Sequence, residues 1–250
     1  MYIDTHCHIS KEYYDDIDLL MKENSDNNIN KIIVSGCDKE SIDESIELVK
    51  KYNNLYLTIG FHPEFANQIN DDDLKLLEEK LKFNKIVGLG EIGLDYYYVK
   101  DNKDKQKELF EKQLKLAEKL YLPIVVHSRE ATKDTIDILK KYKLKGVIHC
   151  FSGSVESAKI YVDMGYKIGI GGVVTFKNSN LFKVVESIGV ENIVLETDAP
   201  YLAPVPFRGK QNSSKYIPYI AERVAEILAI DVEKVAEITT RNAIDLFDLD

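Results

Sequence analysis

The chain has 250 residues, of which 44% are hydrophobic and 30% are charged, and its formal net charge is −9. This composition is typical of a soluble globular protein, and the length suits one large α/β domain spanning residues 1–250. The negative charge argues against a protein that grips long duplex nucleic acid through a broad basic surface. It does not exclude a nucleolytic active site, because metal ions bring their own positive charge.

The sequence offers no sign of membrane insertion or secretion. No apolar stretch approaches the roughly 20 residues that a membrane-spanning helix needs, and residues 1–10 lack the regions of a secretory signal. Cys7, Cys37 and Cys150 show no pairing pattern, which indicates a reducing compartment. We therefore expect a cytoplasmic protein with no membrane partner. The oligomeric state stays open, and a monomer is compatible with the sequence.

Strand-like and helix-like segments alternate along the whole chain, without a linker or low-complexity interruption. The segments that read as strands are residues 2–5, 31–35, 55–60, 86–91, 123–127, 146–150, 166–171 and 192–197. Most are continuous runs of Val, Ile and Leu, the pattern of parallel strands buried on both faces. Helical patterns occupy residues 41–51, 72–82, 104–120, 131–142, 155–164, 214–228 and 231–247.

Eight such units in 250 residues predict a single (β/α)₈ barrel of the TIM type. A doubly wound open sheet is the alternative, since it also alternates strands with helices. In a barrel, the functional groups lie at the C-terminal ends of the strands.

All five histidines follow strand-like runs: His6, His8, His62, His127 and His149. Two acidic residues stand in equivalent places, Glu91 after residues 86–90 and Asp198 after residues 192–197. Neighbouring parallel strands would bring these side chains to one end of one sheet. A cluster of imidazoles and carboxylates is what a di-metal hydrolase needs.

Each of these residues also has a simpler structural interpretation. His6 and His8 face the same side of an extended strand and can bind one ion, although a His-x-His pair can also be a polar strand terminus. Asp4 upstream and the other histidines favour ligation. Glu91 could be a buried glutamate paired with Lys or Arg, but a carboxylate can also bridge two ions.

The other candidate residues also have more than one interpretation. His127 and His149 could each be a hydrogen-bonded core residue, but their matched placement favours ligation. Glu196 should face the same side as Asp198, which makes it a supporting or catalytic candidate. His62 could hold a substrate phosphate, act as an acid, or orient its loop.

Short motifs at the strand ends follow one another through the chain: IDTHCH at 3–8, GFHPE at 60–64, GEIGLDYY at 90–97, PIVVHSRE at 123–130, HCFSG at 149–153, LETDAPYL at 195–202, PFRGK at 206–210 and TTRNAIDLF at 239–247. Together they resemble the TatD-like metal-dependent deoxyribonucleases, within the amidohydrolase-type barrels. One departure concerns substrate contacts. After PFRGK the family pattern continues with an Arg and a Pro near the asparagine, whereas this chain reads Gln211-Asn212-Ser213-Ser214.

The resemblance implies two divalent ions and six ligands: His6, His8 and Asp198 on the first, His127 and His149 on the second, and Glu91 between them. It also implies cleavage of DNA phosphodiesters, often from the 3′ end. The nitrogen-rich donor set suits Zn²⁺ or Mn²⁺ better than Mg²⁺, whereas the likeness to nucleases favours Mg²⁺, so the metal stays open.

The expected reaction is attack of a metal-activated water on phosphorus. Asp198 would orient that water or accept its proton, with Glu91 and His62 as the other catalytic residues. The sequence contains no Ser/His/Asp elbow and no Walker-type loop, so no nucleophilic side chain is expected.

Substrate contacts are expected from residues that follow the strand-like segments. Arg129, Arg208 and Lys210 could meet phosphates at the catalytic rim. Four aromatic residues are placed either to stack unpaired bases or only to pack loops: Phe61, Tyr97, Phe176 and Tyr201. Stacking would favour single-stranded DNA or DNA ends as the partner.

Two other functions remain open at this stage. The same ions could polarise a carbonyl, so the chain could hydrolyse an ester or amide, for example by removing a D-amino acid from tRNA. A barrel without activity could serve as a binding partner, but such a protein would be expected to lack one or more ligands. All six ligand positions are present here.

Overall fold

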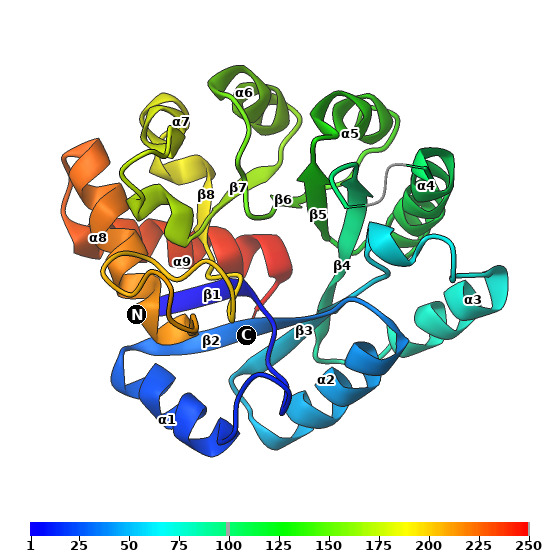
Figure 1. The fold of residues 1–250 in the computed structure, drawn as a ribbon, viewed down its shortest axis with the longest axis horizontal. Helices are drawn as coiled ribbons and strands as arrows, with labels where there is room; N and C mark the ends of the chain where they lie inside the picture. Colours follow the sequence, from blue (N-terminus) through cyan, green and yellow to red (C-terminus); the bar gives the residue numbers. More distant parts are fainter. Residues whose placement is uncertain (99–100, 250) are drawn as a thin grey trace.

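Eight parallel strands lie side by side in chain order, from β1 to β8 (Figure 1). They are β1 (Tyr2–Cys7), β2 (Ile29–Gly36), β3 (Leu55–Ile59), β4 (Ile86–Asp95), β5 (Ile124–Arg129), β6 (Gly146–Ile148), β7 (Lys167–Ile170) and β8 (Ile193–Leu195). The structure is a computed structural model and describes residues 1–98 and 101–249. A doubly wound sheet would break the strand order, so the predicted barrel is confirmed and that alternative is wrong.

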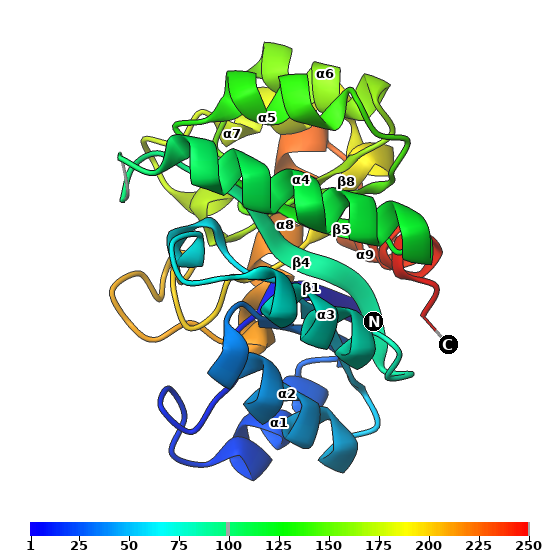
Figure 2. The ribbon, with the colours of Figure 1, turned by 90° about the vertical axis from the view of Figure 1, so that its right-hand side faces the viewer.

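Helices surround the strands (Figure 2). They are α1 (Ile17–Asp26), α2 (Lys39–Lys51), α3 (Asp71–Lys80), α4 (Lys103–Leu120), α5 (Thr132–Leu139), α6 (Val155–Asp163), α7 (Leu181–Ile188), α8 (Ile217–Leu228) and α9 (Val232–Phe247). Helices α1 and α7 are missing from the predicted set, although the buried residues Leu181, Val184, Val185 and Ile188 of α7 recur at helical spacing. None of the helices in the described ranges is both long and apolar enough to cross a bilayer.

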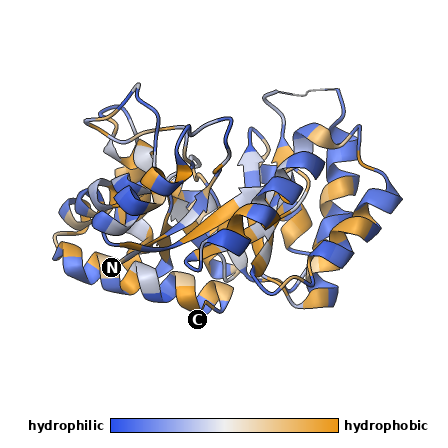
Figure 3. Cartoon of the chain, turned by 90° about the horizontal axis from the view of Figure 1, so that it is seen from below, coloured by the Kyte–Doolittle hydropathy of each residue, from blue (hydrophilic) through white to orange (hydrophobic). Residues whose placement is uncertain are grey.

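The core consists of the buried strands and the inner faces of the helices (Figure 3). Within the barrel, Ile33, Val125 and Val194 form a cluster with Leu246 and Phe247 of α9. Helix α9 therefore closes one end of the barrel with apolar side chains. The C-terminal ends of the strands lie at the opposite end, which stays available for polar groups.

Hydrogen bonds between β1 and the segment after β8 close the barrel. Cys7 forms a parallel bridge with Ala199. The backbone N–H of Asp198 donates to His6 O (3.0 Å), and that of His8 donates to Ala199 O (2.7 Å). The contacts that close the sheet therefore also fix three predicted ligands beside one another.

Strand β4 is longer than the sequence suggests. It continues to Asp95, so the prediction that it ends at Glu91 is wrong. Gly90 and Gly93 let two strands approach closely. A Cβ atom at Gly93 would lie 2.0 Å from His127 O on β5, and the φ angle of Gly93 is +145°. The extension places Asp95 beside the end of β5, where the backbone of Asp95 lies in register with that of Arg129.

Two buried glutamines on α4 hold the backbone of the strand ends. Gln113 accepts from Phe61 N (2.8 Å) and donates to Phe61 O (3.0 Å). Gln106 likewise accepts from Asp95 N (2.9 Å) and donates to Asp95 O (2.8 Å). Both side chains are fully buried. Their spacing along α4 puts them on one face of the helix, so α4 positions the residues next to His62 and at the end of β4.

Replacing Gln113 should destabilise the fold measurably. Gln113→Ala leaves the N–H and C=O of Phe61 buried without partners, which should lower the free energy of unfolding by about 1–3 kcal/mol. Urea denaturation measures this, with Lys115→Ala on the exposed face of α4 as the control. Equal stability of the two variants would contradict the role assigned to the glutamine.

Candidate active site

The predicted ligands meet at the open end of the barrel. His8, His62, Glu91, His127, His149 and Asp198 line one cavity of about 990 Å³. His6 lies beside them and is fully buried. The structure therefore brings together all five histidines and both acidic residues.

Glu91 stands between two sets of imidazoles. Its Oε1 lies 2.6 Å from His127 Nδ1 and 2.9 Å from His149 Nε2. Its Oε2 lies 3.4 Å from His6 Nε2. Each carboxylate oxygen thus faces a different set of ring nitrogens. All ion pairs of Glu91 within the described ranges are with histidines, so the alternative of a Lys or Arg partner is wrong.

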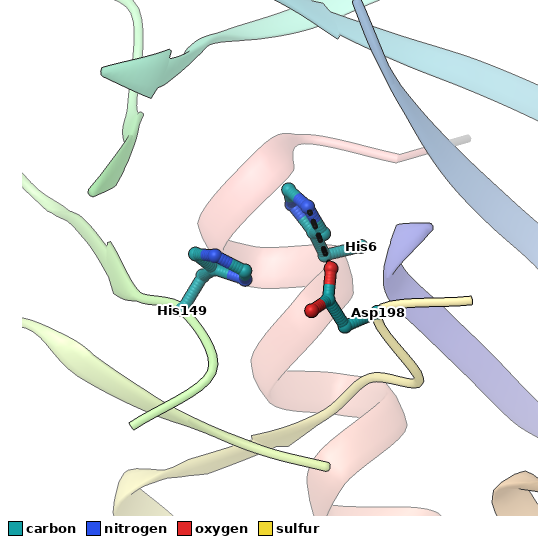
Figure 4. A group of neighbouring side chains, drawn as sticks. All are labelled: His6, His149 and Asp198. Carbon is teal, nitrogen blue, oxygen red and sulfur yellow. Dashed lines mark ion pairs between the residues drawn. The ribbon is translucent and has the colours of Figure 1, made fainter. Parts of the chain in front are cut away.

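In the first set of imidazoles, His6 lies on β1 and His8 directly follows it. The carboxylate of Asp198, beyond the end of β8, lies beside them. The two Nε2 atoms face each other at 3.3 Å. Asp198 Oδ1 lies 3.7 Å from His6 Nε2 and 3.5 Å from His8 Nε2. Figure 4 shows the carboxylate of Asp198 turned toward His6, with His149 on the other side.

Asp4 forms hydrogen bonds that hold the backbone next to His6 and Asp198. Its Oδ1 accepts from His6 N (3.2 Å) and Thr197 N (3.0 Å), and its Oδ2 accepts from the Thr197 hydroxyl (2.6 Å). Burial raises the pKa of Asp4 to about 7, although the hydrogen bonds with Thr197 oppose this shift. Asp4 therefore links the ends of β1 and β8 directly beneath the histidines.

His127 has a carboxylate at each ring nitrogen. Nδ1 faces Glu91, and Nε2 lies 3.0 Å from Asp95 Oδ2. Asp95 is held in turn by the backbone N–H groups of Tyr97 (2.8 Å) and Tyr98 (3.0 Å). Burial opposes protonation, but the hydrogen bonds with Asp95 and Glu91 raise the pKa of His127. If His127 were to hold an ion through Nδ1, Asp95 would keep the remaining ring proton on Nε2.

Sequence reasoning assigned no role to Asp95. The available signal was the motif GEIGLDYY, in which Asp95 stands four residues after Glu91 and on the same side of an extended strand.

Glu196 plays a comparable part for His149. Its Oε1 lies 3.6 Å from His149 Nδ1 and accepts from the Cys150 N–H. A Cβ atom at Gly169 would lie 2.3 Å from Glu196 Oε2, so β7 needs glycine there. The supporting role expected of Glu196 therefore agrees with its position, behind His149 rather than in the cavity.

His62 is oriented by the turn that follows it. It caps the 3₁₀ helix η1 (Pro63–Phe65), and its Nδ1 accepts from Glu64 N (3.3 Å). Glu64 Oε2 also lies 3.3 Å from Nδ1, where it can stabilise a protonated ring. His62 Nε2 lies 3.7 Å from Glu91 Oε1. His62 thus presents Nδ1 to Glu64 and Nε2 to the cavity.

The charges of the site favour ionised carboxylates. Burial would raise the pKa of Glu91, but His149 and His127 hold it well below its ordinary value. Burial likewise opposes the ionisation of Asp198, yet the hydrogen bond with His8 and the nearby histidines lower its pKa. Both carboxylates are thus anionic at neutral pH and surrounded by ring nitrogens.

The donor set fits divalent metal ions. Ligand atoms of His6, His8 and Glu91 lie within 4.8 Å of one another, as do those of Glu91, His127 and His149. Two Nε2 atoms that face each other beside a carboxylate are poorly arranged for hydrogen bonding alone. Buried Nδ1 of His6 also has no hydrogen-bond partner among the described residues. Imidazole and carboxylate together suit Zn²⁺, Mn²⁺ and similar ions.

Cys37 is a further residue of the site that sequence reasoning did not place there. It follows β2 directly, and its Sγ lies 3.7 Å from Glu91 Oε2. The signal was present, because Cys37 follows its strand in the same way as the histidines follow theirs. The three cysteines are free thiols, as expected from their spacing.

The predicted phosphate-binding residues lie at different places. Arg129 lines the cavity, and its Cζ lies 4.0 Å above the ring of Tyr97 and 4.7 Å above that of Tyr98. Arg208 and Lys210 are exposed on the loop after β8 and are not among the cavity-lining residues.

The four aromatic residues differ in exposure and in what they contact. Of the two alternatives for Phe61, base stacking is wrong, because Phe61 is 3% exposed and packs in the core. Tyr201 is 51% exposed and lines the cavity. Phe176 lies 4.5 Å below Arg208, and Tyr97 lies below Arg129.

Comparison with known proteins identifies the family. The model of the family described as TatD-related DNase matches residues 3–248. The chain belongs to this family. It is 40% identical to YabD of Bacillus subtilis, an uncharacterized metal-dependent hydrolase, over 99% of each chain. The structure of the TatD homolog YjjV from Escherichia coli superposes with a TM-score of 0.93 at 30% identity, covering 100% of this chain and 98% of that one. The structure of a TatD family hydrolase from Entamoeba histolytica superposes with a TM-score of 0.88 at 25% identity, covering 98% of this chain and 97% of that one.

Asp95→Asn should weaken metal binding by this TatD family member. The amide keeps the contacts with Tyr97 and Tyr98 but donates to His127 Nε2, which moves the ring proton to Nδ1 and blocks that ligand atom. We expect affinity for a divalent ion to fall by about 10–100-fold. Competition with a chromophoric chelator measures it, with exposed Asp163→Asn as the control. Unchanged affinity would show that Asp95 does not position His127.

Proposed function

We propose that this protein is a metal-dependent hydrolase that cleaves phosphodiester bonds in DNA, acting from the 3′ end of single-stranded or frayed DNA. The observation that carries the proposal is the position of Glu91, with one carboxylate oxygen toward each set of imidazoles. The relatives named as metal-dependent hydrolases support hydrolysis. The family description, TatD-related DNase, supports DNA as the substrate.

Two divalent ions would share six protein ligands: His6, His8 and Asp198 for one ion, His127 and His149 for the other, and Glu91 for both. When bound, such ions activate water and neutralise charge on a phosphate. Zn²⁺ and Mn²⁺ match the imidazoles, and Mg²⁺ would depend more on the carboxylates and water.

Asp198 would act as the general base. Its carboxylate is ionised and lies at the cavity wall, anchored by the hydrogen bond of its own N–H to His6 O. A carboxylate fixed in this way can accept the proton of the attacking water while the water adds to phosphorus.

His62 would act as the general acid. The acid form would be the protonated ring, with Nδ1–H directed at Glu64 Oε2 3.3 Å away and Nε2–H on the cavity side, so that the ring becomes neutral once it has given up the Nε2 proton. Cleavage of a DNA phosphodiester produces a sugar alkoxide, which is a poor leaving group unless it is protonated. His62 can supply that proton.

Arg129 would bind a substrate phosphate. Its guanidinium lies over the rings of Tyr97 and Tyr98 and lines the cavity, where it can meet phosphate oxygens. Arg208 and Lys210 lie outside the cavity and would contact phosphates further along a single strand. Exposed Tyr201 offers a ring for an unpaired base at the cavity rim.

A direct test uses metal-stripped protein and a 5′-labelled single-stranded DNA, with Mg²⁺, Mn²⁺ or Zn²⁺ added separately. We expect a ladder that shortens from the 3′ end only when metal is present. Asp198→Asn should lower the rate by at least about 10²-fold, because the water loses its base. Asp163→Asn, an exposed residue outside the cavity, is the matched control.

Two results would count against the proposal. Cleavage without added metal would remove the ions from the reaction. Failure to cleave DNA with any ion, combined with hydrolysis of D-aminoacyl-tRNA or a small amide, would assign the site to carbonyl substrates instead.

His62→Gln should separate proton donation from the rest of the mechanism. We expect DNA cleavage to fall by about 10²–10⁴-fold. Hydrolysis of bis(p-nitrophenyl) phosphate should fall far less, because p-nitrophenolate leaves without a proton. Rates with both substrates, at equal metal content, measure the difference. Equal losses on the two substrates would assign His62 to positioning rather than acid catalysis.

A further inference from the structure

Charge is distributed unevenly around the catalytic cavity. Four acidic residues that have no part in the mechanism line it on the side of β1 and β2: Glu12, Asp38, Glu40 and Glu44. We call these four residues the acidic wall. Among the described residues, Arg129 at the end of β5 is the only Lys or Arg that lines the cavity. Helix α2, which carries Glu40 and Glu44, lies across the barrel from α7 (Figure 1).

The carboxylates of the acidic wall have no cationic partners. Within the described ranges, none of the four forms an ion pair with Lys or Arg. The neighbouring Lys39 pairs with Asp73 instead, at 2.7 Å. Glu12, Glu40 and Glu44 are exposed. The wall therefore presents uncompensated negative charge to the cavity.

Asp38 also removes a feature that would otherwise attract a phosphate. The N-terminus of a helix binds anions through its free N–H groups. At the start of α2, the Asp38 side chain already accepts from Glu40 N (2.8 Å) and Ser41 N (3.0 Å). Glu40 adds a further carboxylate to the first turn. A phosphate on this side of the cavity would thus meet carboxylates rather than N–H groups.

The opposite side of the cavity is suited to a polyanion. Residues 199–221 contain no Asp or Glu, in a chain with 42 acidic residues, and include Arg208 and Lys210. Arg208 Cζ lies 4.5 Å from the ring centroid of Phe176, which precedes α7. Within the described ranges, neither Arg129 nor Arg208 forms an ion pair with a carboxylate. Their guanidinium groups can therefore bind phosphates.

We propose that the acidic wall makes the protein require a chain end, because it repels the phosphate that follows the scissile one in an uninterrupted strand. The proposal rests on the proposed function and assigns residues to its end specificity. A terminal nucleoside with a free 3′ hydroxyl brings no further phosphate to the wall, whereas an internal nucleoside brings one. The rest of the strand leaves over Arg129 and Arg208. Juxtaposed like charges reject a wrong partner in this way.

Linear and circular single-stranded DNA of one sequence test the end requirement. We expect the metal-loaded wild type to cleave the circle at least about tenfold more slowly. Glu40→Lys/Glu44→Lys should raise the ratio of circular to linear cleavage at least about tenfold, because it replaces repulsive charges with attractive ones. A circle that the wild type cleaves as fast as linear DNA would overturn the proposal.

Asp43→Lys/Glu47→Lys is the matched control. Both residues are exposed on α2 and lie outside the cavity, and the variant changes the net charge by the same amount. We expect it to keep the ratio of the wild type. An equal rise in both double variants would assign the effect to net charge and contradict the wall.

Glu12→Lys, on the segment between β1 and α1, is a second variant that leaves α2 unchanged. It should raise the ratio in the same direction if the double variant on α2 does not fold. A ratio like that of the wild type, in a variant with an unchanged melting temperature, would contradict the role of the wall.

Binding measurements separate this proposal from the reaction. Fluorescence anisotropy with metal-loaded His62→Gln, which retains all six ligand residues, gives the affinities of labelled linear and circular DNA. A preference for linear DNA that Glu40→Lys/Glu44→Lys removes, without any cleavage, would support the wall and contradict the reaction. Metal-dependent cleavage of both DNAs at equal rates would support the reaction and contradict the wall. Equal affinities for the two DNAs would likewise count against the wall.

Discussion

The burial of one carboxylate among imidazoles is the constraint on which the rest of the site depends. Glu91 is 4% exposed, and a buried anion without partners is strongly destabilising. Four histidine nitrogens lie within 3.7 Å of its two oxygens. Such an arrangement is stable with protonated rings, and also with cations held between the rings and the carboxylate. The second state leaves the cavity free for substrate chemistry, which is why the geometry favours a metal centre.

Acidic residues behind the ligands keep these polar side chains in place. Asp95 fixes His127, and Glu196 stands behind His149. Asp4 ties β1 to the end of β8, where the hydrogen bonds that close the barrel also align the neighbouring ligands. Because these contacts come from strand ends rather than long loops, the ligands are held by the same interactions that hold the sheet. Fold stability and site geometry are therefore coupled.

The sequence was sufficient for the barrel and for the residues that meet at its open end, because apolar runs and the polar residues after them follow simple periodic rules. It was insufficient where two strands approach through glycine. Gly90 and Gly93 hid the continuation of β4, and with it the position of Asp95. It left two alternatives open for Phe61, because a residue at a strand end can turn into the core or into the cavity.

Anomalous diffraction from crystals soaked in Mn²⁺ or Zn²⁺ would locate the ions relative to Glu91. We expect two peaks, each bound by a different oxygen of Glu91. One peak should also contact His6, His8 and Asp198, and the other His127 and His149. A single peak, or two peaks of which one is not bound by Glu91, would contradict a shared carboxylate at the centre of the site.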